Sequence, residues 1–362
     1  MERSFRSGSR DRDRVPRSAR PARSYERPKH GVLGARHARG SVRCAAGLRP
    51  RPARPQGRPK GAPVTPSATL PLTIAVCSNR PDSLPGAIAR ITPAMGPRDS
   101  MLIIADMPTH QLPLLPEDVS PTPSRFRVIC NEANRGLAYS RNKAMKESPT
   151  RHLVFLDDDI VPNAHALDEM RGALAAGAHV TGTRITAHLQ GHRRPWFLTS
   201  GQLHYLGSHA PSRPASIWGG SFAIDVEHAR LLGVGFDERL GRIGSSLTSA
   251  EDTTFVREMT TGGATATILH GADVQHLIPT HRLTLSYLLR RAFWQGRSEA
   301  RRNDARRGIA KEWGRNRSGD GVRRVRTALA MLYTASVLLG VCWEVITGHQ
   351  ASAIDDETKR GD

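Results

Sequence analysis

Three consecutive carboxylates, Asp157, Asp158 and Asp159, directly follow the apolar run from Leu153 to Leu156. The run indicates a short buried strand, and three acids at its end repel one another and lose solvation, so a positive partner is expected beside them. In an extended segment, residues two apart point the same way, so Asp157 and Asp159 are expected to reach one divalent cation. Magnesium and manganese bind through one or two carboxylates plus phosphate oxygens, which suggests a diphosphate as the third component. The alternative is an acidic surface turn, or a sheet edge whose acids pair with Arg or Lys.

The elements that must position these acids read as an α/β fold. Residues 72–77, 101–106 and 126–131 are apolar runs typical of strands, and residues 134–148 have apolar positions at helical spacing before the run that ends in the triplet. Strands alternating with helices predict a parallel sheet with right-handed crossovers. Ligands bind at the carboxyl ends of such strands. Polar residues gather at these predicted ends: Ser78, Asn79, Arg80, Asp106, Asn134, Arg135 and the Asp triplet.

From about Leu72 to Arg302 the sequence resembles family 2 glycosyltransferases. Seven pieces occur in the order of that family: LTIAVCSNRPDSL, MLIIAD, NRGLAYSRNKAM, VFLDDDIVP, WGGSFAIDVEHARLLGVGFDERL, SAEDTTFVREMTTGG and VQHLIPTHRLTLSYLLRRAFWQGRS. The resemblance implies the GT-A nucleotide-sugar-binding fold, with a mostly parallel central sheet flanked by helices. It also implies an inverting transfer of a sugar from a nucleoside diphosphate sugar. Processive members of the family carry Gln-x-x-Arg-Trp where this chain has RAFWQGR, so processive polymer synthesis is not expected.

The resemblance also implies roles for individual residues. Asp157 and Asp159 match the metal-binding D-x-D, His276 resembles a histidine that completes a manganese or magnesium site, and Asp252 beside Glu251 resembles the catalytic base. The remaining matches are to donor-binding positions. They are Asn79, Arg80 and Asp106 for base and ribose; Arg135, Gly136 and Asn142 in a stretch closing over the nucleotide; Asp157 and Asp158 on the donor; Gly219 and Gly220 beside the sugar; and Arg291 and Trp294, with Arg290, near diphosphate or acceptor.

The implied chemistry agrees with these residue types. A leaving diphosphate builds negative charge that a metal neutralises, and the attacking hydroxyl must lose its proton to a carboxylate. A neighbouring acid such as Glu251 is expected to raise the apparent pKa of the pair. Structural readings stay open at this point. Glu251 and Asp252 also suit the cap of a helix starting at Thr253, His276 may serve structure alone, and Trp218 either stacks on a sugar or simply packs.

The charge of the chain is concentrated at its start. The 362 residues have a formal net charge of +20, and residues 1–66 contain 18 Lys and Arg against four Asp and Glu. This segment is rich in Pro, Gly and Ser, so we expect a disordered basic tail over residues 1–67. The expected glycosyltransferase domain covers 68–305, and a C-terminal helical segment and tail cover 306–362. The first residues do not form a secretory signal, and the four cysteines suggest neither a metal site nor a disulfide framework.

An uncharged stretch at 327–343 follows the basic residues Arg323, Arg324 and Arg326. It is short for a membrane span, so we expect a helix that lies on a membrane or packs on the body. The expected location is the cytoplasm, at the cytoplasmic face of the membrane if this helix binds lipid. The expected partners are a nucleoside diphosphate sugar and a glycan, lipid-linked or small-molecule hydroxyl acceptor, as in cell-envelope glycan synthesis, with no specific nucleic acid.

Two rival functions remain open from the sequence. A nucleotidyltransferase also uses a parallel sheet with an acidic metal site, although the residues after the first strand, SNRPDS, are not a glycine-rich phosphate loop. A nucleic-acid-binding protein acting through its basic tail is the second, although no recognition motif is visible in the rest of the chain.

Overall fold

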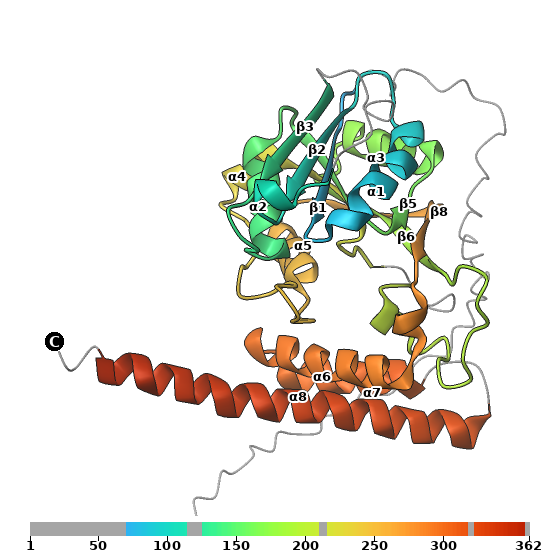
Figure 1. Ribbon diagram of the computed structural model, residues 1–362, viewed down its shortest axis with the longest axis vertical. Helices are drawn as coiled ribbons and strands as arrows, with labels where there is room; N and C mark the ends of the chain where they lie inside the picture. Colours follow the sequence, from blue (N-terminus) through green and yellow to red (C-terminus); the bar gives the residue numbers. More distant parts are fainter. Residues whose placement is uncertain (1–69, 114–124, 210–215, 318–321, 359–362) are drawn as a thin grey trace, which may run out of the picture. The chain divides into compact units, whose positions relative to one another are not determined.

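Eight strands form one mixed sheet in the described part of the chain (Figure 1). The computed structural model describes residues 70–113, 125–209, 216–317 and 322–358, so the expected tail at 1–67 lies outside the described residues. The strand order is β3-β2-β1-β4-β7-β6-β8-β5. The strands are β1 Thr73–Ser78, β2 Ser100–Ala105, β3 Phe126–Cys130, β4 His152–Leu156, β5 Ile160–Val161, β6 Val180–His188, β7 Ser221–Asp225 and β8 Ala266–Leu277. The helices are α1 Leu84–Ile91, α2 Leu137–Glu147, α3 Ala164–Ala175, α4 Val226–Leu231, α5 Glu251–Thr261, α6 Leu285–Arg301, α7 Ala305–Arg317 and α8 Arg323–Thr358.

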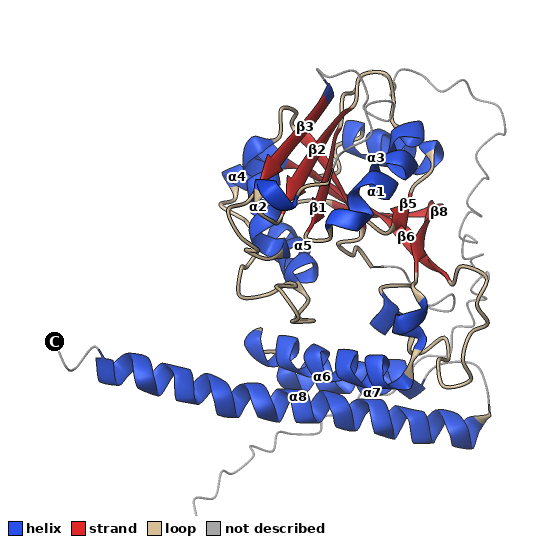
Figure 2. Ribbon diagram, in the orientation of Figure 1, coloured by secondary structure: helices blue, strands red, loops and turns tan. Residues whose placement is uncertain are grey.

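The α/β class expected from the sequence is confirmed, with helices flanking the sheet (Figure 2). The four apolar runs expected as strands form β1, β2, β3 and β4, which pair in parallel. The β6–β8 pair is also parallel, whereas β4–β7, β6–β7 and β5–β8 are antiparallel. Because β1, β2 and β4 run in the same direction, their carboxyl ends and the residues that follow them lie at one edge of the sheet.

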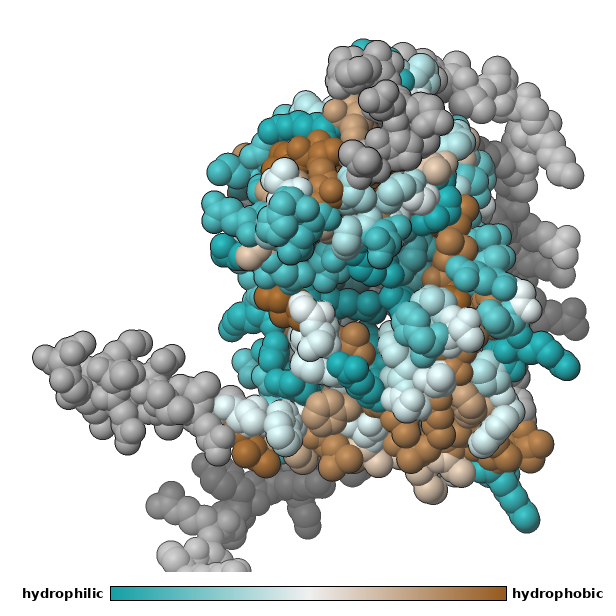
Figure 3. All heavy atoms as spheres, viewed as in Figure 1, coloured by the Kyte–Doolittle hydropathy of each residue, from teal (hydrophilic) through white to brown (hydrophobic). Residues whose placement is uncertain are grey.

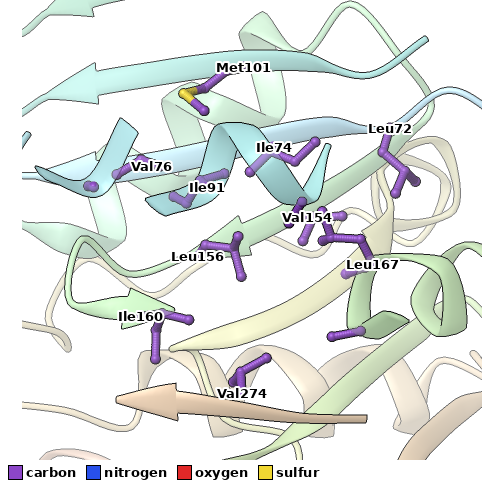
Figure 4. Packing of buried hydrophobic residues seen from close by; sticks show 14 of the residues in the cluster. Leu72, Ile74, Val76, Ile91, Met101, Val154, Leu156, Ile160, Leu167 and Val274 are labelled. Carbon is purple, nitrogen blue, oxygen red and sulfur yellow. The ribbon is translucent and has the colours of Figure 1, made fainter. Parts of the chain in front are cut away.

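Both faces of the first strands are buried, as their unbroken apolar runs predict. Along β1, Ile74 and Val76 enter one apolar cluster with α1 and α3 (Figure 4), while Ala75 and Cys77 enter a second cluster on the opposite face with α2 and α5. Alternate side chains of a strand point to opposite faces, so one strand contributes to both cores. Because residues of β1 and β4 are packed on both faces of the sheet, the positions at which these two strands end are fixed relative to the rest of the sheet.

The last three helices, α6, α7 and α8, pack on one another in the C-terminal part of the chain (Figure 1). Leu288 of α6 shares a third apolar cluster with Tyr333 and Val337 of α8. Two glycines, Gly296 of α6 and Gly340 of α8, lie at the crossing, where a Cβ on either would collide with the backbone carbonyl of the other helix. The two backbones therefore touch, and α8 is held along α6. The expected domain boundary at residue 305 remains a prediction.

The outer face of α8 is apolar and exposed. Arg323–Thr347 is long and apolar enough to cross a membrane by length and composition, but only a third of its most apolar window is buried in the protein, 33%. Brown apolar spheres along the α8 layer are visible in Figure 3. The exposed large side chains recur at helical spacing: Val325, Met331, Leu332, Leu338, Leu339, Trp343, Val345 and Ile346.

Candidate active site

A cavity of about 480 Å³ lies where the sheet edge faces the C-terminal helices. Its walls come from the ends of β1, β2 and β4, the segment before β7, the start of α5, and α6 and α7. Most side chains that the sequence nominated line this one cavity: Asn79, Arg80, Asp106, Asp157, Asp158, Asp159, Gly219, Gly220, Glu251, Asp252, His276 and Arg291.

The Asp triplet forms a turn, so the extended geometry expected for it is wrong. The backbone N–H of Ile160 donates to the carbonyl of Asp157 (3.0 Å), which closes the turn between β4 and β5. The N–H of Asp157 donates to the carbonyl of Gly220 (3.1 Å) and fixes the first acid against the glycine pair. Asp157 and Asp159 still both reach the cavity, because the turn, rather than strand alternation, presents them.

Arginines supply the positive charge that the acids require. Arg80 pairs with both Asp158 and Asp159, the latter at 3.0 Å. Asp159 has two further partners. Arg282 Nη1 lies 3.4 Å from its Oδ2, and His276 Nε2 lies 3.2 Å from its Oδ1. Sequence analysis left this Arg pairing open as an alternative, and the structure shows that it occurs.

The two cavity-facing acids of the triplet differ in proton affinity. Burial, Asp158 and Asp159 raise the pKa of Asp157 above its ordinary value, although Arg141 opposes them. Burial would also raise the pKa of Asp159, but His276, Arg282 and Arg80 outweigh it and hold that pKa well below the usual range. Additional positive charge in the cavity would therefore favour the ionised form of Asp157 most.

Asp158 holds the turn rather than facing a ligand freely. Its side chain is buried, and Oδ2 accepts hydrogen bonds from the hydroxyls of Ser78 and Ser83, both at 2.5 Å. Arg80 donates to the same carboxylate. The residue expected to bind the donor thus ties the end of β1 to the end of β4.

The donor set is compatible with a divalent cation but is not a preassembled metal cage. In the described residues, no group of three or more His, Cys, Asp or Glu is placed to hold an ion. Asp157 uses Oδ1 for Arg141 and keeps a side chain that is 38% exposed towards the cavity. Carboxylate oxygens are the ligands that magnesium and manganese prefer, and these ions take the rest of their ligands from phosphate and water. Asp157 and Asp159 fit that role, with the half-exposed Arg80 as the group that a cation would replace.

Asp106 is engaged by the loop that precedes α2. Its Oδ1 accepts from the N–H of Arg135 (2.8 Å) and its Oδ2 from the N–H of Gly136 (2.8 Å). The Asn131 amide donates to Oδ1 at 2.7 Å. Asp106 therefore lines the cavity at the end of β2 and at the same time holds this loop closed over it.

The acidic pair begins α5, which starts at Glu251, two residues earlier than the capping alternative assumed. Ala250 before it has φ +81°, a left-handed conformation that costs a non-glycine residue roughly 1–3 kcal/mol and is concentrated at functional sites. Glu251 is buried against Arg141, whose Nη1 lies 2.8 Å from Oε1. Burial and the neighbouring Asp252 raise the pKa of Glu251 to about 7.

Asp252 lies on the cavity wall beside the glycine pair. Its Oδ2 accepts from the N–H of Gly219 at 2.5 Å, and its Oδ1 accepts from the N–H of Thr253 at 2.6 Å. A Cβ on Gly219 would lie 2.6 Å from Arg141 Nη2, so only glycine admits the guanidinium there. The preceding Trp218 stacks on His209 with ring centroids 3.9 Å apart, which gives it a packing partner within the protein.

Five nominated residues lie away from the cavity lining: Arg135, Gly136, Asn142, Arg290 and Trp294. Arg290 donates to the carbonyl of Ser245 (3.0 Å). Asn142 donates to the carbonyl of Phe236 and accepts from its N–H, so it holds the segment after α4 in place. Arg135 stacks over Tyr139, and Trp294 lies under the guanidinium of Arg297. Gly136 acts on the site through its backbone, because its N–H donates a hydrogen bond to Asp106.

Sequence reasoning missed the most connected residue of the site, Arg141. This side chain is 1% exposed and joins Asp157 (3.1 Å), Glu251 (2.8 Å) and the carbonyl of Gly219 (2.9 Å). The available signal was its position on α2, where it shares the buried face with Ala138 and Ala144. A charge at an apolar helical position indicates a buried partner. Five other lining cations were also missed, on the α4–α5 connection (Arg242), on the β8–α6 connection (Arg282) and on or next to α6 and α7 (Arg302, Lys311 and Arg315).

Comparison with known proteins gives one family match. Residues 73–231, from β1 to the end of α4, match the model described as Glycosyl transferase family 2. No curated protein matches the chain at a significant level.

Several solved structures are similar at low identity. Residues 1–349 of TarS from S. aureus are 11% identical, with 74% of this chain and 71% of that chain covered and a TM-score of 0.40. The mannosyltransferase PcManGT from Pyrobaculum calidifontis, in complex with GDP-Man and Mn²⁺, is 13% identical, with 83% of each chain covered and a TM-score of 0.44. Likeness at this level does not transfer activity.

Proposed function

We propose that this chain, whose residues 73–231 match the model of glycosyl transferase family 2, is a member of that family and moves a sugar from a nucleoside diphosphate sugar to a hydroxyl acceptor with inversion at the sugar carbon. The observation that supports this is the shared cavity. It contains the carboxylates of Asp157 and Asp159 at one wall and that of Asp252 at another, connected through Arg141 and Gly219.

Asp252 is the proposed general base. As the acceptor oxygen attacks the sugar carbon and the bond to the diphosphate breaks, the hydroxyl proton moves to the Asp252 carboxylate. Inversion requires this one base and no covalent intermediate on the enzyme. The N–H groups of Gly219 and Thr253 hold the carboxylate in place, so its orientation does not depend on a flexible side-chain partner.

Arg141 is proposed to position both acids. Its guanidinium is fully buried between Asp157 and Glu251, so neither carboxylate moves without leaving an unpaired buried charge. Asp157 and Asp159 would hold a divalent cation beside His276, and that cation would neutralise charge on the leaving diphosphate. The missing side chain at Gly219 makes room for the Arg141 guanidinium, and both glycines line the cavity in which the sugar would lie.

The test is nucleotide binding measured by thermal unfolding of the full chain. UDP, GDP, CDP and ADP are added with and without manganese, and one of them is expected to raise the melting temperature more in its presence. A ligand at 100 times its Kd stabilises a protein by about 2.7 kcal/mol. Asp157→Asn should abolish the manganese-dependent part. Asp237→Asn is the matched control, because Asp237 pairs with Arg239 and does not line the cavity. An unchanged response in Asp157→Asn would refute the donor site.

We also propose that α8 binds a lipid surface from the cytoplasmic side. Its outer face presents Met331, Leu339 and Ile346 to solvent, and the exposed Arg323 and Arg324 stand at the start of the helix. An apolar face next to basic residues matches an anionic lipid surface. The glycine crossing holds the other side of α8 against α6, which supports a helix lying on the surface rather than spanning the bilayer.

A further inference from the structure

We propose that the helical wall of the cavity, formed by Arg291 of α6 and Lys311 of α7, together with Arg242 of the α4–α5 connection, binds an anionic group on the acceptor, so that the acceptor carries a phosphate or a carboxylate. This inference rests on the proposed glycosyl transfer and names the chemical class of its second substrate. All three cations line the cavity.

Arg291 is a buried guanidinium without a carboxylate partner among the described residues. It is 8% exposed, and its Nε is buried with no hydrogen-bond partner. The contact at Nη1 is a long one, 3.4 Å to the amide oxygen of Gln295. Burying a charge without a partner costs several kcal/mol, so such a group is expected to meet an anion when the site is filled.

The acids of this wall are already paired with other groups. Glu299 accepts from Gln295 (2.8 Å) and pairs with Arg302 (3.3 Å). Glu312 pairs with His204 (2.7 Å) and with Arg315 (2.8 Å). These pairs leave the charges of Arg242, Arg291 and Lys311 in excess at the cavity surface.

The proximity of Arg242 increases the need for an anion. Burial, followed by Arg242, lowers the pKa of Arg291. One anion placed between two like charges stabilises both of them. Guanidinium groups bind phosphate and carboxylate oxygens through paired hydrogen bonds, which orients the bound group as well as holding it.

The position of this wall favours the acceptor over the donor diphosphate. The turn that leads into Asp252 is tied to α6, because Ser249 N–H donates to Ser298 Oγ (3.0 Å) and Ser249 Oγ donates to Gln295 (3.3 Å). The carboxylates proposed to hold the metal have their own arginines, Arg80 and Arg282 for Asp159 and Arg141 for Asp157. An anion at Arg291 would thus be anchored on the side of the base, where the attacking hydroxyl must lie.

The experiment measures binding of glycerol 3-phosphate, with glycerol as the uncharged control, to the full chain by calorimetry. The nucleoside diphosphate that gives the largest thermal shift is present with manganese at saturation, so that the diphosphate site is filled. We expect glycerol 3-phosphate to bind and glycerol not to bind. Arg291→Gln should weaken binding at least tenfold and Arg291→Lys should restore part of it. Arg307→Gln removes the same charge from an exposed position of α7 outside the cavity and should have no effect.

A second arm separates a soluble from a lipid-borne anion. Dihexanoyl phosphatidic acid, dispersed below its micelle concentration so that its head group is free to enter the cavity, replaces glycerol 3-phosphate, and binding to either probe that depends on Arg291 supports the proposal and identifies the source. Equal binding by Arg291→Gln and the unchanged chain to both probes would overturn it. A Kd for the nucleoside diphosphate weakened tenfold in Arg291→Gln would also overturn it, because Arg291 would then serve the donor. If no nucleotide binds the unchanged chain, the proposed function fails, while phosphate binding without nucleotide still tests the anion site.

Discussion

Arg141 contacts one acid on the proposed metal side of the cavity, Asp157, and one acid beside the proposed base, Glu251. One guanidinium reaches the first Asp of the triplet, the first acid of α5 and the carbonyl of the glycine pair. Because the group is buried, its charge is not screened by water, and the acids on either side are expected to respond together to a change in either. Variants at this site therefore need separate measurements of binding and of rate.

At the residue scale, Asp252→Asn should separate these two quantities. The amide keeps the shape but cannot take the acceptor proton, so the transfer rate is expected to fall by about 10² to 10⁴. Donor binding should change little, since Asp252 faces the acceptor. The measurement pairs single-turnover transfer with a nucleotide Kd. Glu258→Gln, an exposed acid on the same helix, is the control. Transfer at the unchanged rate in Asp252→Asn would remove Asp252 from the mechanism.

Glu251 predicts a specific pH dependence of stability. Its folded pKa is raised to about 7 from an ordinary 4.5, so between these values the folded state holds a proton that the unfolded chain releases. The contribution of Glu251 is therefore most favourable below pH 4.5, declines as pH rises to about 7 and is constant above. Urea unfolding at several pH values should show this decline in the unchanged chain and lose it in Glu251→Gln. A decline of the same size in Glu251→Gln would show that another group titrates.

Several site residues could be predicted from sequence, and the reason is local. Asp157 directly follows the apolar run that places it, so its position could be predicted from the residues themselves, whereas Gly219 and Asp252 were nominated through the family resemblance. Arg141 and Arg242 were not found, because an arginine's role depends on partners far away in sequence; Glu251 is 110 positions from Arg141. The turn at the triplet was also missed, because the carbonyl of Gly220, distant in sequence, accepts from the N–H of Asp157 and holds the turn in place.

At the scale of elements, Asp99 joins three parts of the first half of the fold. Its side chain is fully buried and accepts from the N–H groups of Leu72 (3.1 Å) and Gly96 (2.7 Å). Both oxygens also accept from the guanidinium of Arg171 on α3, each at 2.9 Å. The start of β1, the start of β2 and α3 therefore share one carboxylate.

Asp99→Asn should destabilise the protein by about 3–5 kcal/mol, because it leaves Arg171 buried without its charge partner. Asp168→Asn removes the exposed partner of the same arginine and should cost less than about 1 kcal/mol. Burial alone would raise the pKa of Asp99, but Arg171 and the N–H of Gly96 lower it. Its contribution is thus present above pH 3.8 and lost below. Equal midpoints in urea for the two variants would contradict this role.

The strands and their order along the chain were more predictable than their pairing. The runs that became β1, β2 and β4 are almost wholly apolar, and buried parallel strands require this, whereas the edge strand β3 contains the exposed Arg127. The antiparallel insertion of β7 between β4 and β6 was not visible, because pairing direction depends on where the intervening chain returns. Of the cations on the helical wall, Arg291 was nominated through the family resemblance, whereas Lys311 has the sequence appearance of an ordinary surface charge.

At the scale of the whole molecule, the outer face of α8 should bind anionic vesicles. Met331→Glu and Leu339→Glu place charges on that face and are expected to reduce flotation with phosphatidylglycerol vesicles. Leu231→Glu, at an exposed position of α4, is the matched control and should float normally. Each arginine near the helix start is expected to add about 1 kcal/mol of attraction, so added salt should weaken binding. Normal flotation of both α8 variants would exclude this face as the lipid contact.

The contact between Gly296 and Gly340 sets the distance between the cavity and any lipid surface to which α8 binds. The face of α6 that carries Arg291 lines the cavity, and α8 lies on α6 at the glycine crossing. Two helices in contact have a thickness of about 15–20 Å. If α8 rests on lipid, the reacting hydroxyl stands at least that far from the headgroups. A membrane-held acceptor would then need a spacer of that length between its lipid and the sugar-accepting oxygen, so acceptors with short head groups should react only after release from the bilayer.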